Sequence, residues 1–579
     1  MLELKEEQNT DGGIGYPSVE KPWLKYYTKE QIQAPVPNVS LFEYLMEKNK
    51  DYPNDIALEY FGNKITYGRL FEMIDGASRA FYALGVRPGD IISIVTVSTV
   101  TSIVCFYALN RLGAVSNYVN VLSEETELAD YFKEAKSKIV VSLDLFGNKV
   151  IRASQKSGVE KVIFFSVGDE MPFLTHVGYK LKTRSMNKDW MQSPLSLLWA
   201  DFIELASKQN ELENRKDPYK MALLCHTGGT TGTPKAVMLS DVAMNSVADY
   251  YRQCFKYERG QVWGNIMIPF VVYGILVCMH MPLCLGLTVS IIPKFDAKDW
   301  KKYLKKSHIN YILGVPAYVN PMIDNDTLKS FDMSQLLLCG VGGDGMNAEM
   351  EQKINAFFAE HGANIEILKG YGMSEVCGTA ITGLNGVNKI GSVGIPLIHN
   401  NVMIYDNESC TELTYGKTGE ICLQCASQMM GYMDNEEETR NLIRKHDDGQ
   451  EWLHTGDLGY LDEDGFLFLQ GRMKRVILTT GDGVAYKVFP QTVENVLNEI
   501  PEVLQSCVVG ASKGDDQVLR AFVVIEQTSD DKKQIERELR SVSENKLPAH
   551  ARPTFYTFVD ELPLTSAGKI DYRSLENYE

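Results

Sequence analysis

The sequence lacks the features that mark several classes of protein. Its 11 cysteines are scattered without even spacing, so we predict neither a disulfide framework nor a zinc site, and a reducing compartment is favoured. The first 20 residues are polar and include no apolar segment typical of a secretory signal, which favours a cytoplasmic protein. The chain also lacks an excess of positive charge, since its formal net charge is −17. This balance argues against general binding to nucleic acid or to anionic membranes.

Residues 262–293 lack charge altogether, because they contain no Asp, Glu, Lys or Arg. The run is long enough to span a bilayer, so a membrane-bound carrier is one alternative. Helix breakers and one histidine interrupt it, however: Gly264, Pro269, Gly274, His280, Pro282 and Gly286. We therefore predict a strand, a turn, a buried helix and a second strand, with no integral membrane segment.

A chain of 579 residues is too long for one core, so we expect at least two domains. Predicted strands alternate with helices along most of the sequence, at 91–97, 139–143, 162–165, 289–292, 311–314 and 335–339. This alternation predicts an α/β domain whose mixed or parallel sheets are covered by helices. A capping box at Ser40–Glu43 opens one helix, and residues 56–67 are expected to form a hairpin. Residues 167–217 show no clear pattern.

The last hundred or so residues differ from the rest of the chain. Helices are predicted at 494–500 and 532–546, and strands at 506–510 and 521–526. They indicate a small α+β domain with a core of its own. We place the boundary at a hinge near Gly471, which gives an N-terminal domain of residues 1–471 and a mobile C-terminal domain of residues 472–579.

The centre of the sequence is a Gly- and Thr-rich loop that follows a predicted buried strand at Met221–Leu224. The loop contains Thr227, Gly228, Gly229, Thr230, Thr231 and Gly232, and ends at Lys235. Small residues let successive N–H groups point into one hollow, threonine hydroxyls add donors, and Lys235 adds a mobile charge. This composition suits a polyphosphate. It is not a Walker A loop, because Thr-Pro separates Gly232 from Lys235, and a flexible surface loop is the alternative interpretation.

This loop resembles the phosphate loop of the AMP-forming (adenylate-forming) ligases, a superfamily of acyl-CoA synthetases, adenylation enzymes and luciferases. Further blocks resemble that family in the same order. Tyr371-Gly372-Met373-Ser374-Glu375 resembles its Y-G-x-T-E motif, and Trp452–Tyr460 resembles the block that carries Asp457. Gly471–Lys474 resembles its hinge, and Leu562–Arg573, with Lys569, resembles its terminal block. The resemblance covers nearly the whole chain.

The resemblance implies a role for each of these residues. Lys569, Lys235 and Glu375 would be catalytic, with Glu375 holding Mg²⁺. Tyr371 would face adenine, Ser374 the phosphate, and Asp457 the ribose hydroxyls. Lys474 would be the pivot of the mobile domain. The implied ATP-binding set is Thr227, Gly228, Gly229, Thr230, Thr231, Gly232, Gly342, Gly343, Gly370, Tyr371, Gly372, Ser374, Asp457 and Arg472.

Plainer interpretations exist for several of these residues. Gly340–Gly345 matches the G-x-G-x-x-G pattern of dinucleotide oxidoreductases, although the expected acidic residue is not clearly placed. Tyr371 could be a core residue, Asp457 part of an Asx-turn, and Lys569 a surface charge. The order of the blocks along the chain favours the ligase interpretation of each.

The resemblance also constrains the reaction. It implies ATP-dependent activation of a carboxylic acid to acyl-AMP and transfer to coenzyme A; the alternative is an enzyme that loads a carrier-protein thiol. Pro269–Gly274 lacks the Asp of amino-acid-activating relatives, so a hydrophobic acid is expected. The predicted acyl pocket comprises Phe270, Tyr273, Gly274, Val341, Met373 and Val376. The loop at 479–490 is longer than usual, which leaves the thiol acceptor open.

Overall fold

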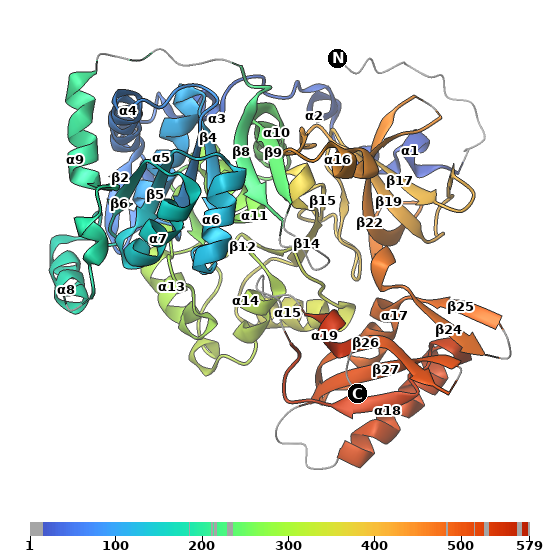
Figure 1. Ribbon diagram of the computed structural model, residues 1–579. Coiled ribbons are helices and arrows are strands. Elements are labelled where there is room, and N and C mark those ends of the chain that lie inside the picture. Colours follow the sequence, from blue (N-terminus) through green and yellow to red (C-terminus); the bar gives the residue numbers. More distant parts are fainter. Residues whose placement is uncertain are drawn as a thin grey trace.

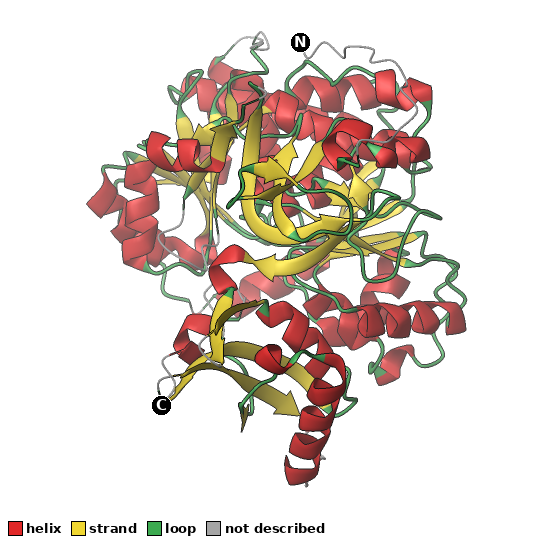
Figure 2. Ribbon diagram, turned by 90° about the vertical axis from the view of Figure 1, so that its right-hand side faces the viewer, coloured by secondary structure: helices red, strands yellow, loops and turns green. Residues whose placement is uncertain are grey.

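Two large sheets, each built from distant parts of the chain, form the frame of the N-terminal domain (Figures 1 and 2). The computed structural model describes residues 15–184, 186–209, 212, 217–227, 235–447, 449–481, 484–514, 516–525, 532–563 and 570–576. Within these residues, the first sheet has the order β16-β15-β14-β13-β12-β10-β11-β1-β2 and the second β20-β9-β8-β4-β3-β5-β6-β7. The predicted α/β class, with a smaller α+β domain after it, is confirmed.

The strands of the first sheet are β1 (Ile56–Tyr60), β2 (Asn63–Thr66), β10 (Val262–Asn265), β11 (Thr288–Ile291), β12 (Tyr311–Gly314), β13 (Leu338–Val341), β14 (Ile367–Tyr371), β15 (Ile381–Thr382) and β16 (Ile395–Pro396). Those of the second are β3 (Ile91–Val95), β4 (Val115–Val119), β5 (Ile139–Leu143), β6 (Lys161–Phe165), β7 (Ser196–Leu198), β8 (Met221–His226), β9 (Ala236–Ser240) and β20 (Gly431–Tyr432). Most pairings within each sheet are parallel, as the strand–helix alternation predicts.

Helices pack on these sheets, except the first, which contacts the third sheet described below. They are α1 (Pro17–Glu20), α2 (Lys29–Gln33), α3 (Leu41–Asn49), α4 (Tyr67–Ala83), α5 (Val100–Leu112), α6 (Glu125–Glu134), α7 (Gly147–Ser157), α8 (Phe173–Thr183), α9 (Trp199–Glu204), α10 (Asp241–Cys254), α11 (Val272–Ile275), α12 (Met281–Cys284), α13 (Trp300–Ser307), α14 (Pro316–Val319) and α15 (Ala348–Glu360). The predicted capping box is present, because Ser40 and Glu43 bond each other's backbone N–H groups at the start of α3.

A third, antiparallel sheet leads to the C-terminal domain. It contains β17 (Asn401–Asp406), β18 (Thr411–Glu412), β19 (Gly419–Gln424), β21 (Ile443–Lys445), β22 (Glu451–Leu461) and β23 (Leu467–Arg472), and α16 (Glu436–Leu442) lies beside it. The C-terminal domain contains β24 (Ile477–Gly481), β25 (Val484–Val488), β26 (Val503–Lys513), β27 (Asp516–Ile525), β28 (Phe555–Phe558), α17 (Pro490–Leu497), α18 (Lys532–Lys546) and α19 (Tyr572–Glu576). Its buried residues form their own cluster, which includes Val493, Leu497 and Leu539.

The charge-free run at 262–293 folds inside the protein. It forms β10, then α11, a π-helical turn at Leu276–His280 and α12, and finally β11. His280 is fully buried between the hydroxyl of Tyr107, 2.9 Å from Nδ1, and Oδ1 of Asn245, 3.0 Å from Nε2. The predicted strand, buried helix and strand are therefore confirmed. Among the described residues, no helix is both long and apolar enough to cross a membrane.

Three predictions about elements were incomplete or wrong. β4 and α6 were not predicted, because β4 carries Ser116 and Asn117, which interrupt its apolar pattern although both are buried. Asn117 is satisfied there, since its amide donates to Ser93 Oγ at 2.9 Å. The segment at 167–217 includes α8 and α9, and the strand predicted at 335–339 starts at Leu338.

Candidate active site

The two ends of the Gly- and Thr-rich loop are joined by hydrogen bonds. Thr227 N–H donates to the Lys235 carbonyl at 2.9 Å, and Lys235 N–H donates to Thr227 Oγ1 at 3.1 Å. The antiparallel strands β8 and β9 therefore hold these residues side by side. Gly228, Gly229, Thr230, Thr231 and Gly232 lie outside the described residues. The backbone of Lys235 is thus fixed at the base of the loop.

Lys235 lies among acidic and aromatic side chains. Its ammonium group forms an ion pair with Glu438 of α16 and lies 4.9 Å above the ring of Tyr432 in β20. Tyr432 in turn donates its hydroxyl proton to Glu375 Oε1 at 2.7 Å. The ion pair with Lys235 holds the pKa of Glu438 below its usual value. The two predicted catalytic residues of the N-terminal domain therefore share one neighbour.

Glu375 is a buried carboxylate with few compensating contacts. Its side chain belongs to the short 3₁₀ turn Ser374–Val376 that follows β14. Burial raises the pKa of Glu375, and the hydrogen bond from Tyr432 and the charge of Lys235 oppose that shift. A carboxylate held in this way gains from a cation, and Mg²⁺ commonly uses one or two carboxylates together with phosphate oxygens. The residue fits the metal-binding role predicted for it.

Three other predicted residues come together from three strands. Tyr371, the last residue of β14, donates its hydroxyl proton to Asp457 Oδ2 at 2.8 Å. Arg472, the last residue of β23, lies with Nε 3.1 Å from Asp457 Oδ1. Asp457 and Arg472 are directly paired in the β22–β23 ladder. The arrangement presents an aromatic ring, a carboxylate and a guanidinium group at one place.

The glycine-rich turn after β13 borders a narrow pocket. Gly343 has a φ of +79°, a conformation that favours glycine. The pocket is about 20 Å³, room for about one water molecule. Its described lining includes Tyr251, Phe255, Tyr273, Leu313, Leu338, Gly340, Val341, Gly342, Gly343, Leu368, Gly370, Gly378, Thr379 and Thr382. No charged side chain is among them.

The predicted acyl-pocket residues divide into two groups. Tyr273 and Val341 line the pocket, whereas Phe270, Gly274, Met373 and Val376 are not in its described lining. Gly274 packs against backbone, because an added Cβ would lie 2.1 Å from the Ile268 carbonyl oxygen. Gly372 also packs against backbone, since an added Cβ would lie 2.6 Å from the Gly378 carbonyl oxygen.

Sequence reasoning missed several residues of this site. Glu438 was not predicted, because it stands in a run of three glutamates and nothing in the sequence shows which of them faces Lys235. Tyr251 and Phe255 of the pocket were also missed. They are four residues apart at the end of α10, with Phe255 directly after its last residue, and this spacing is a usable signal because it brings the two rings together, with centroids 5.4 Å apart.

The proposed hinge begins where β23 ends. Lys474 is exposed in the 3₁₀ turn Met473–Arg475, and its charge lowers the pKa of Glu438. Arg475 forms a 2.5 Å ion pair with Glu494 inside the C-terminal domain. Lys569 lies outside the described residues, so its predicted catalytic role stays a prediction.

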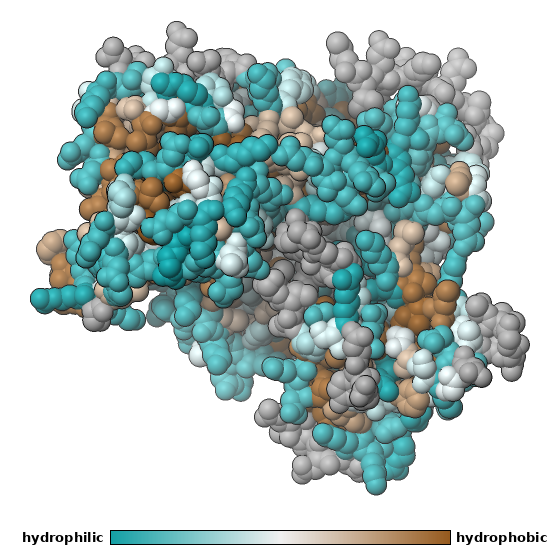
Figure 3. Space-filling model, in the orientation of Figure 1, coloured by the Kyte–Doolittle hydropathy of each residue, from teal (hydrophilic) through white to brown (hydrophobic). Residues whose placement is uncertain are grey.

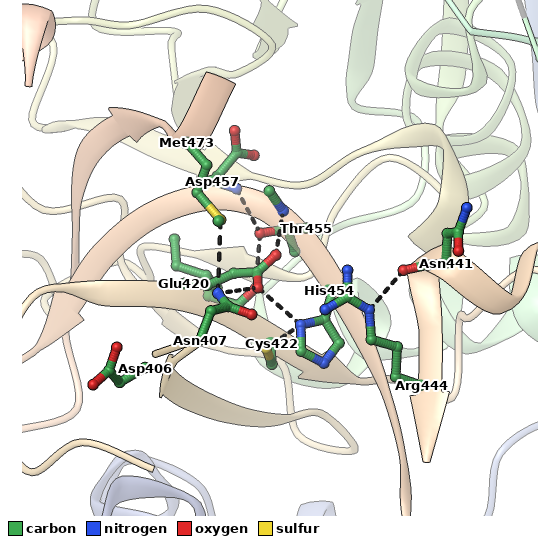
Figure 4. Close-up of polar contacts among 12 residues, drawn as sticks. Asp406, Asn407, Glu420, Cys422, Asn441, Arg444, His454, Thr455, Asp457 and Met473 are labelled. Carbon is green, nitrogen blue, oxygen red and sulfur yellow. Dashed lines mark hydrogen bonds and ion pairs between the residues drawn. The ribbon is translucent and has the colours of Figure 1, made fainter. Parts of the chain in front are cut away.

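A buried polar cluster lies beneath the turn that carries Asp457 (Figure 4). Glu420 of β19 accepts three hydrogen bonds, from Gly456 N–H at 2.9 Å, from Asn407 Nδ2 at 2.8 Å and from His454 Nδ1 at 2.8 Å. Asn407 Nδ2 also lies 3.8 Å from the sulfur of Met473 in the hinge turn. Glu420 therefore holds the backbone at Gly456, and Asn407 links it to the turn that leads to the hinge.

Glu420, Cys422 and His454 are close enough to one another to be considered as metal ligands, since their donor atoms lie within 4.8 Å. The direct hydrogen bond between Glu420 and His454 already satisfies these two groups, and burial raises the pKa of the Cys422 thiol. Cys425 stands in a Cys-x-x-Cys spacing with Cys422, but it packs in a different cluster. We interpret the group as a hydrogen-bonded cluster.

Comparison with known proteins identifies the family. The sequence model of the AMP-binding enzyme family matches residues 45–433, and that of the AMP-binding enzyme C-terminal domain matches residues 492–569. The chain belongs to the AMP-binding enzyme family. The expected class, an AMP-forming ligase, is therefore confirmed. This membership also favours the ligase interpretation of the Gly340–Gly345 turn over a dinucleotide oxidoreductase.

Two curated relatives of this AMP-binding enzyme are similar over almost their full length. A long-chain-fatty-acid–CoA ligase of Bacillus subtilis (strain 168) is 28% identical over 569 residues, covering 96% of this chain and 98% of the relative. A probable 4-coumarate–CoA ligase of Dictyostelium discoideum is 26% identical over 577 residues, with coverage of 96% and 98%.

Solved structures show the same fold at lower identity. ATP-bound MatB from Rhodopseudomonas palustris is 23% identical with a TM-score of 0.78, covering 93% of this chain and 98% of that one. A benzoate CoA ligase from Burkholderia xenovorans LB400 is 22% identical with a TM-score of 0.78, covering 93% and 100%. At 22–23% identity these structures show that the AMP-binding enzyme shares their fold. They do not identify its substrate.

Proposed function

We propose that this AMP-binding enzyme activates a hydrophobic carboxylic acid with ATP and transfers the acyl group to coenzyme A. The observation that carries the proposal is the meeting of Tyr371, Asp457 and Arg472, with Lys235 and Glu375 joined nearby through their shared neighbour Tyr432. An aromatic ring suits adenine, a fixed carboxylate suits two ribose hydroxyls, and a guanidinium group suits phosphate. The relatives whose names are CoA ligases support coenzyme A as the acceptor.

The proposed adenylation depends more on neutralising the negative charges of the carboxylate and ATP than on a strong base. A carboxylate must approach a tetraanionic nucleotide and meet its α-phosphorus in line. Lys235 and Arg472 reduce that repulsion, and a unit charge pair at about 4 Å is worth about 4 kcal/mol at an effective dielectric near 20. Bound Mg²⁺ would add a hard cation at Glu375. The thiol that attacks acyl-AMP needs little activation, because AMP is a good leaving group.

The composition of the pocket supports a hydrophobic acid. Aromatic and aliphatic side chains and glycine backbone dominate its described lining, in which no charged side chain takes part. A second carboxylate on the substrate would be left without a partner there, which is costly in a buried site. The pocket must widen to admit an acyl chain, because it holds about one water molecule.

We further propose that residues 1–471 and 472–579 move as two bodies about Lys474. Its exposed position in a short turn between β23 and β24 supports this role, because few contacts have to break when the turn changes. In the proposed cycle Lys569 enters the active site for adenylation and leaves it for thioester formation.

Transfer to a carrier-protein thiol is the second candidate. The long 479–490 loop supports it, since this part of the C-terminal domain forms an extended β24–β25 hairpin that differs from the usual family pattern. Both candidates require the same adenylation step, and they differ only in the acceptor.

ATP–pyrophosphate exchange across a panel of fatty, aryl and dicarboxylic acids tests the proposal. We expect exchange with hydrophobic acids, and acyl-CoA product when free coenzyme A is added. Asp457→Asn should raise the KM for ATP by about tenfold or more without changing the order of preferred acids. Exchange with dicarboxylic acids only would refute the hydrophobic acid, and exchange without acyl-CoA formation would favour the carrier protein.

A further inference from the structure

Helix α8 exposes its aliphatic face. Phe173, Leu174 and Leu181 have 78%, 83% and 67% of their surface exposed, and Val177 on the same face is also exposed. These positions recur at intervals of three and four residues, so they form one stripe along the helix. Helices of globular proteins usually bury such a stripe. Here it contacts nothing in the described chain that would remove it from solvent.

The opposite face of α8 attaches the helix to the protein. His176 Nδ1 lies 2.6 Å from the Gly168 carbonyl oxygen, and the ring of Tyr179 packs so closely that a Cβ on Gly168 would lie 2.8 Å from it. Upstream, Tyr60 donates its hydroxyl proton to the Val167 carbonyl at 2.8 Å. The face that carries His176 and Tyr179 therefore packs against the protein, and the aliphatic face points to solvent.

The helix itself carries charge opposite to that of the whole protein, although Asp169 and Glu170 precede it and Asp169 interacts with Lys180. Residues 173–184 contain three basic residues and no acidic one, in a chain with a net charge of −17. At about 3.6 residues per turn, Lys180 and Lys182 lie on either side of the aliphatic stripe, and both are exposed. Screening limits the field of distant acidic residues to about 8 Å at physiological ionic strength. A surface in contact with α8 therefore experiences mainly the charge of the nearby basic residues.

We propose that α8 is a docking helix for the anionic surface of a lipid bilayer. An aliphatic face flanked by lysines is the pattern of helices that lie in the plane of the interface, with apolar side chains below the headgroups and ammonium groups beside the lipid phosphates. Met186 and Met191, which follow the helix in the sequence, are also exposed. The inference does not depend on the proposed function.

The position of α8 is compatible with such docking. The helix projects from the edge of the N-terminal domain, well apart from the C-terminal domain (Figure 1), and hydrophobic side chains gather over it at the left of Figure 3. A bilayer contacting this edge would leave the hinge at Lys474 free to move. A hydrophobic acid dissolved in the bilayer would also be near the enzyme.

Vesicle sedimentation with the full-length protein tests the proposal. The probes are vesicles of phosphatidylcholine alone and vesicles that contain equal amounts of phosphatidylcholine and phosphatidylglycerol. We expect preferential binding to the anionic vesicles, and a loss of about tenfold or more in the partition coefficient for Phe173→Ser/Leu174→Ser/Leu181→Ser. Lys180→Glu/Lys182→Glu should lower binding to the anionic vesicles by at least about tenfold as well. Leu122→Ser, at an exposed leucine far along the chain from α8, is the matched control and should bind like the wild type.

Two readouts distinguish loss of docking from loss of folding. Pyrophosphate exchange without lipid and the thermal unfolding midpoint should be the same in the α8 variants and the wild type. Equal binding of the wild type and the triple-serine variant to anionic vesicles would overturn the proposal. So would a dimer of the wild-type protein that the triple-serine variant converts to a monomer, because the face would then serve a second copy of the chain.

Discussion

At the scale of the residue, the active site depends on a carboxylate whose position is unfavourable for stability. Glu375 is buried, and burial raises its pKa because the charged form loses hydration. A folded-state pKa above the unfolded value means that the native state holds the proton more tightly than the unfolded chain does. The ionised form therefore lowers stability at neutral pH, and protonation at lower pH relieves that loss.

Glu375→Gln should separate activity from stability. We expect pyrophosphate exchange to fall by about 100-fold or more, because a cation site at the phosphates is lost. The thermal unfolding midpoint at neutral pH should stay equal or rise, since the amide oxygen can still accept the proton of the Tyr432 hydroxyl at the place where it now bonds Oε1.

Glu351→Gln is the matched control at another buried glutamate. Glu351 Oε2 lies 2.5 Å from Lys369 Nζ, and both side chains are buried. Removing that carboxylate leaves a buried ammonium group unpaired, so the variant should lose about 3–5 kcal/mol of stability. A comparable loss of stability in Glu375→Gln would contradict the account given for Glu375.

The individual site residues were predictable to different degrees. Tyr371, Glu375 and Asp457 were recognisable because each belongs to a short motif with a fixed spacing. Glu438 and Glu420 were not, because their roles depend on partners more than 30 residues away, Lys235 in one case and Gly456 in the other. A sequence shows which side chains can be charged, but the fold decides which charges meet.

At the scale of the element, the start of α10 contains a buried acid. Asp241 Oδ1 accepts hydrogen bonds from Leu41 N–H at 2.8 Å and from Asn110 Nδ2 at 2.6 Å, and burial raises its pKa to about 7. Its side chain joins α10 to the start of α3 and to α5. The stability of this junction of three helices should therefore depend on pH.

Asp241→Asn should remove one source of pH dependence. In the wild type, the folded protein holds a proton between about pH 4 and 7 that the unfolded chain releases. Its free energy of unfolding should therefore fall as pH rises through this window, by up to about 4 kcal/mol from this group, and stay level above it. The asparagine variant keeps the acceptor oxygen, so its thermal midpoint relative to the wild type should rise from pH 5 to pH 8. An equal difference at both pH values would contradict this prediction.

Glycines in two helices should respond oppositely to the same substitution. Gly274→Ala in α11 places a methyl group 2.1 Å from the Ile268 carbonyl oxygen, so we expect a loss of at least about 1–3 kcal/mol. Gly76→Ala in α4 meets no atom within 4 Å and should add about 0.5–1 kcal/mol. Thermal midpoints of the two variants provide the measurement. Stabilisation by Gly274→Ala would show that the segment before α11 can move away.

Many of the helices and strands could be predicted from the sequence, because apolar residues recur in them with a regular spacing. The strands at 139–143 and 311–314 and the helix at 532–546 match the observed β5, β12 and α18, because apolar residues dominate the two strands and recur at helical spacing in the helix. β4 was missed because its buried polar residues find partners on neighbouring strands. α8 was missed for the opposite reason, since its aliphatic stripe faces solvent and a regular core pattern was not expected there.

At the scale of the whole molecule, the proposed mechanism requires a lysine from each domain at one nucleotide. Lys235 belongs to the N-terminal domain, and Lys569 stands in the C-terminal sequence match. We expect Lys569→Ala to lower adenylation by about 100-fold or more and to spare thioester formation from acyl-AMP supplied ready-made. Lys513→Ala, at an exposed lysine in β26 of the same domain, is the control and should leave both half-reactions unchanged. Adenylation that persists in Lys569→Ala would remove this residue from the mechanism.

Asp457, in the predicted nucleotide site, pairs directly with Arg472, the residue from which the chain continues to the proposed hinge. Arg472 is the last residue of β23, and the turn that contains Lys474 starts directly after it. A nucleoside that displaces or tightens the contact between this guanidinium group and its carboxylate would act on the backbone only two residues before the proposed pivot, Lys474. Under the proposed two-body movement, occupancy of the nucleotide site would reach the C-terminal domain within a single turn of chain, with no relay through the distant core.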